Sequence, residues 1–286
     1  MEKPPVIVFA HRGFRAVAPE NTLAAARAAL AIGARWWELD VAASSDGELI
    51  VIHDDSLART SDAAVRFPER SPWSVYDFTQ AEIESLDAGS WYAASDPFGQ
   101  IKSGFVSASD LARFAGERIP SLRACLEFTK AAGISVNVEI KNAEGRACHP
   151  WLAERVVELL REHDMVGSVL LSSFNHEYIV RAKRAAPGLR TGALVEGAAP
   201  DPVALLDSSG ASSYNPDLET LTEAAVHAVR ASGRDVFVWT VNEEADMERL
   251  IDWGVSGIFT DFPDRLFRVL REAPVTEYPP PIHSDS

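Results

Sequence analysis

The stretch VIVFAHRGFRAVAPENT, residues 6–22, begins as an apolar run of β-favouring residues and then places a histidine and an arginine side by side, followed by a glycine. A helical pattern starts only about ten residues after this pair. A strand that ends in an ionisable pair usually directs that pair at a partner. The stretch therefore predicts a buried strand whose carboxyl end carries charged side chains for function.

The next segment, NTLAAARAALAI (21–32), has apolar residues on one face at helical spacing. Asn21 is expected to be its N-cap, and Gly33 is expected to end the helix. Residues 150–163 repeat the pattern, and a further segment ends at Gly233 in the same way. Helical segments of this kind follow most of the strand-like runs.

The apolar period changes from two to 3.6 and back along most of the chain. Strand-like runs lie at 6–10, 36–42, 49–53, 135–140, 168–174, 191–195, 235–241 and 257–261. A weaker run, GASSYNP near residue 210, would have to supply a sixth barrel strand. This alternation predicts an α/β protein with parallel strands covered by helices.

The chain has 286 residues, of which 47% are hydrophobic, so it can bury a large core. A closed (β/α)₈ (TIM) barrel competes with an open, doubly wound sheet. A single barrel suits a domain of about 250 residues. We therefore predict one barrel domain over residues 1–273.

Residues 56–118 break the alternation with a stretch rich in aromatic residues, Ser, Asp and Gly. Thr79 and Glu82 form a capping-box pattern for one short helix there. The stretch is too long for an ordinary loop, and it is expected to be a small inserted cap after the second strand region. Residues 274–286 contain three consecutive prolines and are expected to form a solvated tail.

The composition excludes several classes of partner. The chain has 27 basic and 42 acidic residues, a net charge of −15, which disfavours nucleic acid and stable association with anionic membranes. No apolar run approaches the roughly 18 residues of a membrane span. Cys125 and Cys148 are the two cysteines, and without a signal-like start they indicate a reducing, cytoplasmic location.

Glu38 and Asp40 lie two residues apart in the run WWELDVA, so both side chains face the same side of the strand, with Cβ atoms about 7 Å apart. Two carboxylates on an inward face are costly unless a cation neutralises them. The alternative is that this face is solvated. The apolar neighbours of the pair favour the inward orientation.

Glu139 and Lys141 are arranged in the same way in SVNVEIK. A third carboxylate on a nearby strand would complete a site of hard oxygen ligands, which Mg²⁺ and Ca²⁺ prefer. The simpler alternative is a structural ion pair between Lys141 and Glu139.

His11 and His53 each follow an apolar strand-like run. Barrel enzymes carry their chemistry at the carboxyl ends of strands. Because histidine can be neutral or charged near neutral pH, a pair can divide the work of base and acid.

The motifs HRG with APENT, ELDV, DGELIVIHDDSLART, LDAGSWY, VNVEIK, SSF, VWTVN and GIFTDFPD, in this order over residues 8–266, resemble the glycerophosphodiester phosphodiesterase family. The resemblance implies a (β/α)₈ barrel with a small insertion and metal-dependent hydrolysis of glycerophosphodiesters to sn-glycerol 3-phosphate and an alcohol. The expected partner is thus a small phosphodiester. The alcohol, the choice of Mg²⁺ or Ca²⁺ and the oligomeric state stay open.

The same resemblance implies the role of each candidate residue. One divalent cation would be bound by Glu38, Asp40 and Glu139. The acid-base pair would be His11 and His53, with the base left open between them. Substrate contacts would come from Arg12, Lys141, Phe174 and Trp239.

Some of these residues also have other interpretations. Core packing is the alternative for Phe174 and Trp239, although the alternation of the strand points Trp239 inward together with Phe237 and Val241. The residues after HRG are Phe14, Arg15 and Ala16, where the family usually has small ones, and this departure is expected to alter the shape and charge of the mouth.

Two other functions compete with this prediction. A lipid-acting, lysophospholipase D-like phosphodiesterase is favoured only by the aromatic residues of the insertion, namely Trp73, Phe78, Trp91, Tyr92 and Phe98. A catalytically silent binding barrel would be expected to lack an acid or a histidine of the set. All five are present.

Overall fold

A closed ring of eight parallel strands organises the chain in a computed structural model that describes residues 5–272. The first strand pairs with the second on one side and with the last on the other, which closes the ring and excludes the open sheet. Within the described residues the barrel strands are β1 (Ile7–Ala10), β2 (Trp36–Ala43), β4 (Ser135–Ile140), β5 (Val169–Ser173), β6 (Arg190–Val195), β7 (Ser213–Pro216), β8 (Asp235–Val238) and β9 (Gly257–Thr260). The weak run near residue 210 is confirmed as the sixth of these.

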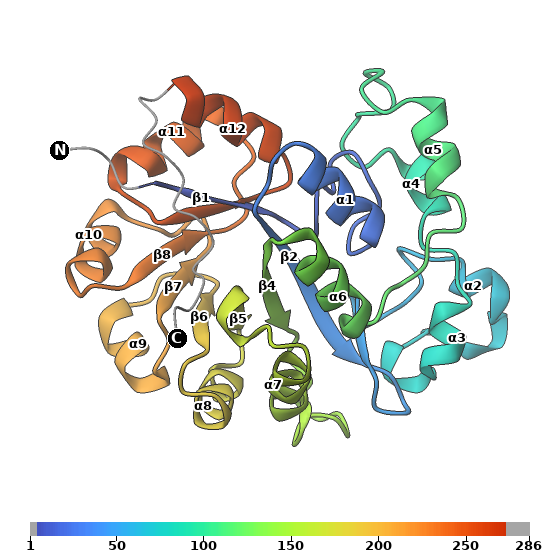
Figure 1. Cartoon of the computed structure of the whole chain (residues 1–286), viewed down its shortest axis with the longest axis horizontal. Helices are drawn as coiled ribbons and strands as arrows, with labels where there is room; N and C mark the ends of the chain where they lie inside the picture. Colours follow the sequence, from blue (N-terminus) through green and yellow to red (C-terminus); the bar gives the residue numbers. More distant parts are fainter. Residues whose placement is uncertain (1–4, 273–286) are drawn as a thin grey trace.

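Each barrel strand leads to a helix that covers the outside of the ring (Figure 1). These helices are α1 (Leu23–Ala31), α6 (Leu122–Ala132), α7 (Leu152–Glu162), α8 (His176–Ala185), α9 (Pro202–Ser209), α10 (Glu223–Ala231), α11 (Glu244–Trp253) and α12 (Pro263–Glu272). Gly233 follows the C-cap of α10 with φ near +79°, as expected of a residue that ends a helix.

The predicted N-cap of α1 is wrong by one residue. Thr22 is the N-cap, and its hydroxyl accepts a hydrogen bond from the backbone N–H of Ala25. Asn21 instead adopts a left-handed backbone conformation, with φ of 57°. Asparagine tolerates this conformation better than most residues, which frees its side chain for another contact.

The run at 49–53 is a strand outside the barrel. It forms β3 (Leu49–Val51), which pairs antiparallel with the far end of β2. The resulting ribbon carries the inserted segment, whose elements are α2 (Ala63–Arg66), η1 (Pro68–Arg70), η2 (Val75–Asp77), α3 (Gln80–Glu84), α4 (Ser90–Ser95) and α5 (Ala108–Phe114). This segment lies to one side of the barrel, beside α1 and α6 (Figure 1). The capping box predicted from Thr79 and Glu82 is present at α3.

Apolar side chains form separate clusters inside and outside the ring. Phe9, Leu170, Phe237 and Phe259 fill the interior, and the rings of Phe9 and Phe259 stack with centroids 4.3 Å apart. A larger cluster lies between strands and helices. Val241 belongs to this outer cluster, so its predicted inward orientation is wrong, because β8 ends before it and the alternation stops.

The Pro-rich segment 274–286, predicted to be a solvated tail, lies outside the described residues. No helix within 5–272 combines the length and the apolar character that crossing a bilayer requires.

Candidate active site

Three carboxylates meet at the carboxyl end of the barrel. Glu38 and Asp40 are on the inner face of β2, and Asp40 is the direct neighbour of Glu139 on β4 in the parallel register. The three residues can each offer one oxygen such that all three oxygens lie within 4.8 Å of one another. The predicted inward orientation of the pair is confirmed, since Glu38 and Asp40 are almost completely buried.

Glu38 is the member of this triad whose surroundings most disfavour a negative charge. Burial, together with the charges of Asp40 and Glu139, raises the pKa of Glu38 well above its usual range. The Oε1 atom of Glu38 is buried and has no hydrogen-bond partner. Three carboxylates that offer hard oxygen ligands, one of them with a buried unpartnered oxygen, fit a divalent cation such as Mg²⁺ or Ca²⁺.

Two cationic side chains border the triad. The Nζ atom of Lys141 lies 2.8 Å from Oε1 of Glu139 and 3.5 Å from Oδ1 of Asp40. The Nε atom of Arg12 lies 3.3 Å from Oδ2 of Asp40. Burial raises the pKa of Asp40, but the charges of Lys141 and Arg12 lower it by more. The net pKa lies below the usual range, so this carboxyl remains ionised. The ion pair between Lys141 and Glu139, the simpler alternative for these two residues, is therefore present, and its glutamate also belongs to the triad.

The glycine of HRG allows the close approach of β1 and α1. Gly13 has φ of +79°, and a Cβ atom there would come within 2.6 Å of the backbone of Ala25. Arg12 also has a positive φ, 52°, and its backbone N–H donates to Oε2 of Glu38 over 2.7 Å. The turn thus holds a metal-ligand candidate through a backbone contact, which does not involve the side chain of Arg12.

His11 is held by a carboxylate from the last strand. Its Nδ1 atom lies 2.7 Å from Oδ1 of Asp261, and its Nε2 atom lies 4.0 Å from Oε2 of Glu38. Burial raises the pKa of Asp261, but His11 and Arg15 lower it to about 2. An ionised carboxylate only accepts, so Nδ1 carries the proton and Nε2 faces the site. Burial lowers the pKa of His11, which favours the neutral ring.

His53 reaches the same mouth by a different route from the one expected. It follows the antiparallel strand β3, where the backbone N–H of Ile52 donates to the carbonyl of Asp40. The ribbon therefore returns the chain to β2 beside the triad. The Nδ1 atom of His53 lies 2.7 Å from Oδ1 of Asp54, so this ring also has a carboxylate partner.

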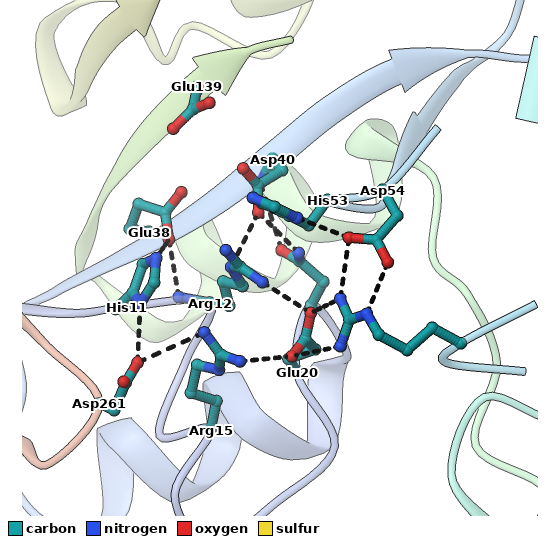
Figure 2. A network of polar contacts seen from close by, with 12 residues as sticks. His11, Arg12, Arg15, Glu20, Glu38, Asp40, His53, Asp54, Glu139 and Asp261 are labelled. Atoms are coloured by element: carbon teal, nitrogen blue, oxygen red, sulfur yellow. Dashed lines mark hydrogen bonds and ion pairs between the residues drawn. The ribbon is translucent and has the colours of Figure 1, made fainter. Parts of the chain in front are cut away.

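A buried glutamate joins the two histidine–carboxylate pairs. Glu20 accepts from Arg12 over 2.8 Å and from Arg59 over 2.7 Å, and forms an ion pair with Arg15 at 2.8 Å. Arg15 lies 3.6 Å from Asp261, and Arg59 donates to Asp54. Figure 2 shows Arg12 and Arg15 both directed at Glu20, between the two pairs.

Sequence reasoning missed four polar residues of this site, although signals for three of them were present. Asp54 directly follows His53 in the sequence. Asp261 directly follows β9 in the same way that His11 follows β1, and these two strands are hydrogen-bonded neighbours. Asn21 was assigned to a cap, but its side-chain amide donates to Asp40 over 2.8 Å. Glu20 lies in the APENT motif, but the sequence gave no signal for its contacts, because one of its arginine partners, Arg59, comes from the insertion.

A cavity of about 370 Å³ opens above these groups. It is lined by His11, Arg12, Glu38, His53, Asn137, Glu139, Lys141, Phe174, Leu194, Glu196, Trp239, Thr240 and Phe259. The rings of Phe174 and Trp239 are in edge contact, with centroids 5.4 Å apart. Eight of the nine predicted site residues therefore line one cavity, and the ninth, Asp40, is buried beside two of them, Glu139 and Lys141.

Phe14 does not shape the mouth as expected. It is buried in the outer apolar cluster, because its backbone N–H donates to the carbonyl of Ala25 and turns the side chain toward the helices. Arg15 does contribute charge near the site, and its guanidinium lies 5.2 Å from the ring centroid of Phe98 in the insertion.

Comparison with known proteins identifies the family of the chain. The model of the glycerophosphoryl diester phosphodiesterase family matches residues 11–265. A glycerophosphodiester phosphodiesterase of Caldanaerobacter subterraneus is 35% identical over 266 residues, covering 93% of this chain and 98% of that protein. One from Bacillus subtilis is 32% identical, covering 92% and 86%.

Solved structures agree as well. An Oleispira antarctica phosphodiesterase, solved in complex with the product sn-glycerol-3-phosphate, has a TM-score of 0.78 and 29% identity, with 93% of this chain and 96% of that chain covered. A Silicibacter pomeroyi protein described as a putative glycerophosphoryl diester phosphodiesterase has a TM-score of 0.80 and 27% identity, with 95% of each chain covered. The chain is therefore a hydrolase that belongs to the glycerophosphoryl diester phosphodiesterase family.

Proposed function

We propose that this enzyme hydrolyses glycerophosphodiesters to sn-glycerol 3-phosphate and an alcohol, with one divalent cation and two histidines. The observation that carries the proposal is the meeting of the carboxylate triad, His11 and His53 at one cavity. The unpartnered Oε1 of Glu38 supports a role in cation binding rather than a purely structural cluster. When bound, a divalent cation would act as a Lewis acid toward the phosphate.

The protein's own cations would position the phosphate. Arg12 and Lys141 both line the cavity, beside the triad. Negative charge grows on the phosphate oxygens in the transition state, so fixed positive charges stabilise that state more than the bound substrate. We assign phosphate binding to Arg12, whose guanidinium stays charged at all relevant pH values, and to Lys141.

The two histidines would divide the proton transfers. One removes a proton from the attacking hydroxyl, which we take to be the 2-hydroxyl of the glycerol, while the other gives a proton to the departing alcohol oxygen. The new P–O bond forms as the bond to the alcohol breaks, and water then opens the cyclic phosphate with the roles reversed. The carboxylate at each Nδ1 leaves Nε2 as the atom that exchanges protons.

The lipid-acting alternative is not favoured by the insertion. Its five aromatic residues named above are buried or half-buried, so they do not form an apolar rim for a membrane surface. Val65 and Phe105 of the insertion are exposed, but neither lines the cavity. Of the other exposed large hydrophobic residues in the described chain, Phe174 and Val180, only Phe174 does.

The reaction can be tested with ³¹P NMR on glycerophosphocholine and the purified protein supplied with Mg²⁺ or Ca²⁺. We expect sn-glycerol 3-phosphate as the phosphorus product, and a transient cyclic phosphate before it. Formation of phosphocholine would mean that the other P–O bond breaks, and absence of any reaction with either metal would contradict the proposed function.

Asp261 is expected to act as a positioning residue for His11. Asp261 accepts from two donors, the Nδ1–H of His11 and the side-chain amide of Asn242. In the Asp261→Asn variant, one of these donors would face an NH₂ group instead of an oxygen. We expect kcat to fall by about tenfold to 100-fold, as is typical when the carboxylate partner of a metal-binding histidine is removed, with little change in KM.

A double-mutant cycle distinguishes this role from general destabilisation. In a His11→Ala background, Asp261→Asn should cause no further loss of kcat, because the ring that it orients is absent. An additive loss in the double variant would show that Asp261 acts on something other than His11.

A further inference from the structure

The side chain of Arg15 connects three parts of the chain that are separate in the sequence. Its Nη2 atom lies 2.8 Å from Oε2 of Glu20, in the same segment between β1 and α1. Its Nη1 atom lies 3.6 Å from Oδ1 of Asp261, directly after the last barrel strand, β9. The guanidinium also lies 5.2 Å from the ring centroid of Phe98 in the insertion. The first barrel segment, the end of the barrel and the insertion therefore meet at Arg15.

The contact of Arg15 with Asp261 is on the oxygen that holds His11. Oδ1 of Asp261 accepts from the Nδ1–H of His11 over 2.7 Å, and Figure 2 shows both side chains directed at this carboxylate. Oδ2 of Asp261 accepts from the side-chain amide of Asn242 over 2.8 Å. A displacement of Arg15 would therefore act on the His11 ring through one shared oxygen.

The ring of Phe98 joins the insertion to the surroundings of Asp261. A guanidinium is attracted to the face of an aromatic ring, which favours the contact between Arg15 and Phe98. Phe98 also makes an edge contact with the ring of Phe262, with centroids 5.5 Å apart. Phe262 directly follows Asp261 in the sequence. The insertion thus contacts the neighbourhood of this carboxylate at two points.

A second line of contacts leads from Arg15 to the other histidine. Glu20 accepts from Arg59 at both oxygens, over 2.7 Å and 3.2 Å. Arg59 belongs to the insertion and also donates to Asp54, the partner of His53. The insertion therefore reaches the carboxylate partners of both histidines, through Arg59 on one side and through Arg15 on the other.

Stability alone does not account for the burial of Arg15. Its side chain is 17% exposed, and its Nε atom is buried without a hydrogen-bond partner. Taking a charged group out of water is costly, and apolar side chains of similar volume often replace buried ion pairs without loss of stability. Both acidic partners of Arg15 have other donors, so neither would become an unpaired buried charge in its absence.

We propose that Arg15 is a positioning residue that couples the insertion to the His11–Asp261 pair, so that the insertion sets how the two histidines face the phosphate. The inference rests on the proposed function, in which His11 and His53 share the proton transfers. Proton transfer requires donor and acceptor within hydrogen-bond reach, and small displacements of reacting groups cost much in rate. Arg15 does not line the cavity, so it acts through Asp261.

Arg15→Met removes the guanidinium and keeps an unbranched apolar side chain. We expect kcat for glycerophosphocholine to fall by about fivefold to tenfold, the size of coupling seen between residues of one network. KM should stay within about twofold of the native value, because the residues that line the cavity are unchanged. Tm should stay close to that of the native protein. Native kcat in this variant, or a change in KM alone, would contradict the positioning role.

Arg70→Met is the matched control, because Arg70 also combines an ion pair with a ring contact. It lies 2.7 Å from Glu82 and 3.6 Å from the ring centroid of Phe78, and all three residues belong to the insertion. This variant should keep native kcat. An equal loss in Arg70→Met and Arg15→Met would show that any disturbance of the insertion lowers activity, and the specific role of Arg15 would be wrong.

A double-mutant cycle tests the link between Arg15 and the insertion. Phe98→Leu alone should lower kcat by about threefold to fivefold. In the Arg15→Met background the same substitution should cause almost no further loss, because residues that act through one contact are not additive. Additive losses would mean that the insertion does not act through Arg15.

Hydrogen exchange separates this proposal from the proposed function, because it requires no turnover. The backbone N–H of Asp261 donates to the side-chain oxygen of Asn242 over 2.9 Å. In metal-free Arg15→Met, peptides that cover residues 257–262 should exchange at least about threefold faster than in the native protein, and in Arg70→Met they should not. A protein that shows this difference but hydrolyses no glycerophosphocholine would contradict the proposed function and support the coupling. Equal exchange in the native protein and Arg15→Met would overturn the coupling whatever the activity.

Discussion

The His53→Ala variant is expected to hydrolyse glycerophosphocholine at least about 100-fold more slowly in kcat than the native enzyme, a cost of about 2.7 kcal/mol in the activation barrier. The ring of His53 lines the cavity, and its Nδ1 is held by Asp54, so Nε2 is the atom available for proton transfer. Alanine offers no group that could take its place. Initial rates at saturating substrate and metal measure the loss.

Stability should hardly change in the same variant. The side chain of His53 is one-third exposed, and Asp54 keeps its contacts with Arg59. Surface substitutions of this kind usually change the free energy of unfolding by at most about 0.5 kcal/mol. His227→Ala, at a strongly exposed position on α10, is the control and should keep native kcat. Native turnover in His53→Ala would exclude an acid-base role for this residue.

The Glu38→Gln variant should lose about 1,000-fold or more in kcat/KM, because a bound metal supplies several kcal/mol of transition-state stabilisation. The metal-free protein should nevertheless be at least as stable as the native one. Glutamine keeps an oxygen that can accept from the backbone N–H of Arg12, and it removes the repulsion from Asp40 and Glu139 that raises the pKa of Glu38. The same substitution thus harms function and spares the apo fold.

Thermal unfolding with and without metal measures both effects. With chelator, Tm of Glu38→Gln should equal or exceed that of the native protein. Saturating Mg²⁺ or Ca²⁺ should raise Tm of the native protein only, since a ligand stabilises the state that binds it. Glu127→Gln, at an exposed position on α6, should behave as the native protein does. A lower Tm of Glu38→Gln in chelator would mean that the buried carboxylate stabilises the apo protein.

The sequence predicted the parts of the site that depend on strand alternation. Glu38 and Asp40 are two apart on β2, and a period of two places both on one face whatever the neighbouring elements do. Glu139 then meets them because β4 pairs with β2 in parallel register. The alternation of parallel strands and covering helices was predictable for the same reason, since both have clear periods.

The contacts that the sequence did not predict are those made between distant segments. Asp261 meets His11 because the ring closes between β1 and β9, and periodicity alone does not tell a closed ring from an open sheet. The direction of β3 was missed because a short apolar run has the same pattern in parallel and antiparallel pairs. Glu20 and Arg59 are brought together by the insertion, whose irregular backbone has no period to analyse.

We propose that a single divalent cation, held by Glu38, Asp40 and Glu139, is required for diester hydrolysis at this site. The most direct measurement is a Mg²⁺ or Ca²⁺ titration of chelator-stripped protein, in which bound metal and release of sn-glycerol 3-phosphate from glycerophosphocholine are followed together. We predict one metal ion bound per chain, with product release rising in proportion to its occupancy. Hydrolysis at the full rate in the stripped protein, or a rate that does not change while the metal binds, would contradict the requirement for a divalent cation.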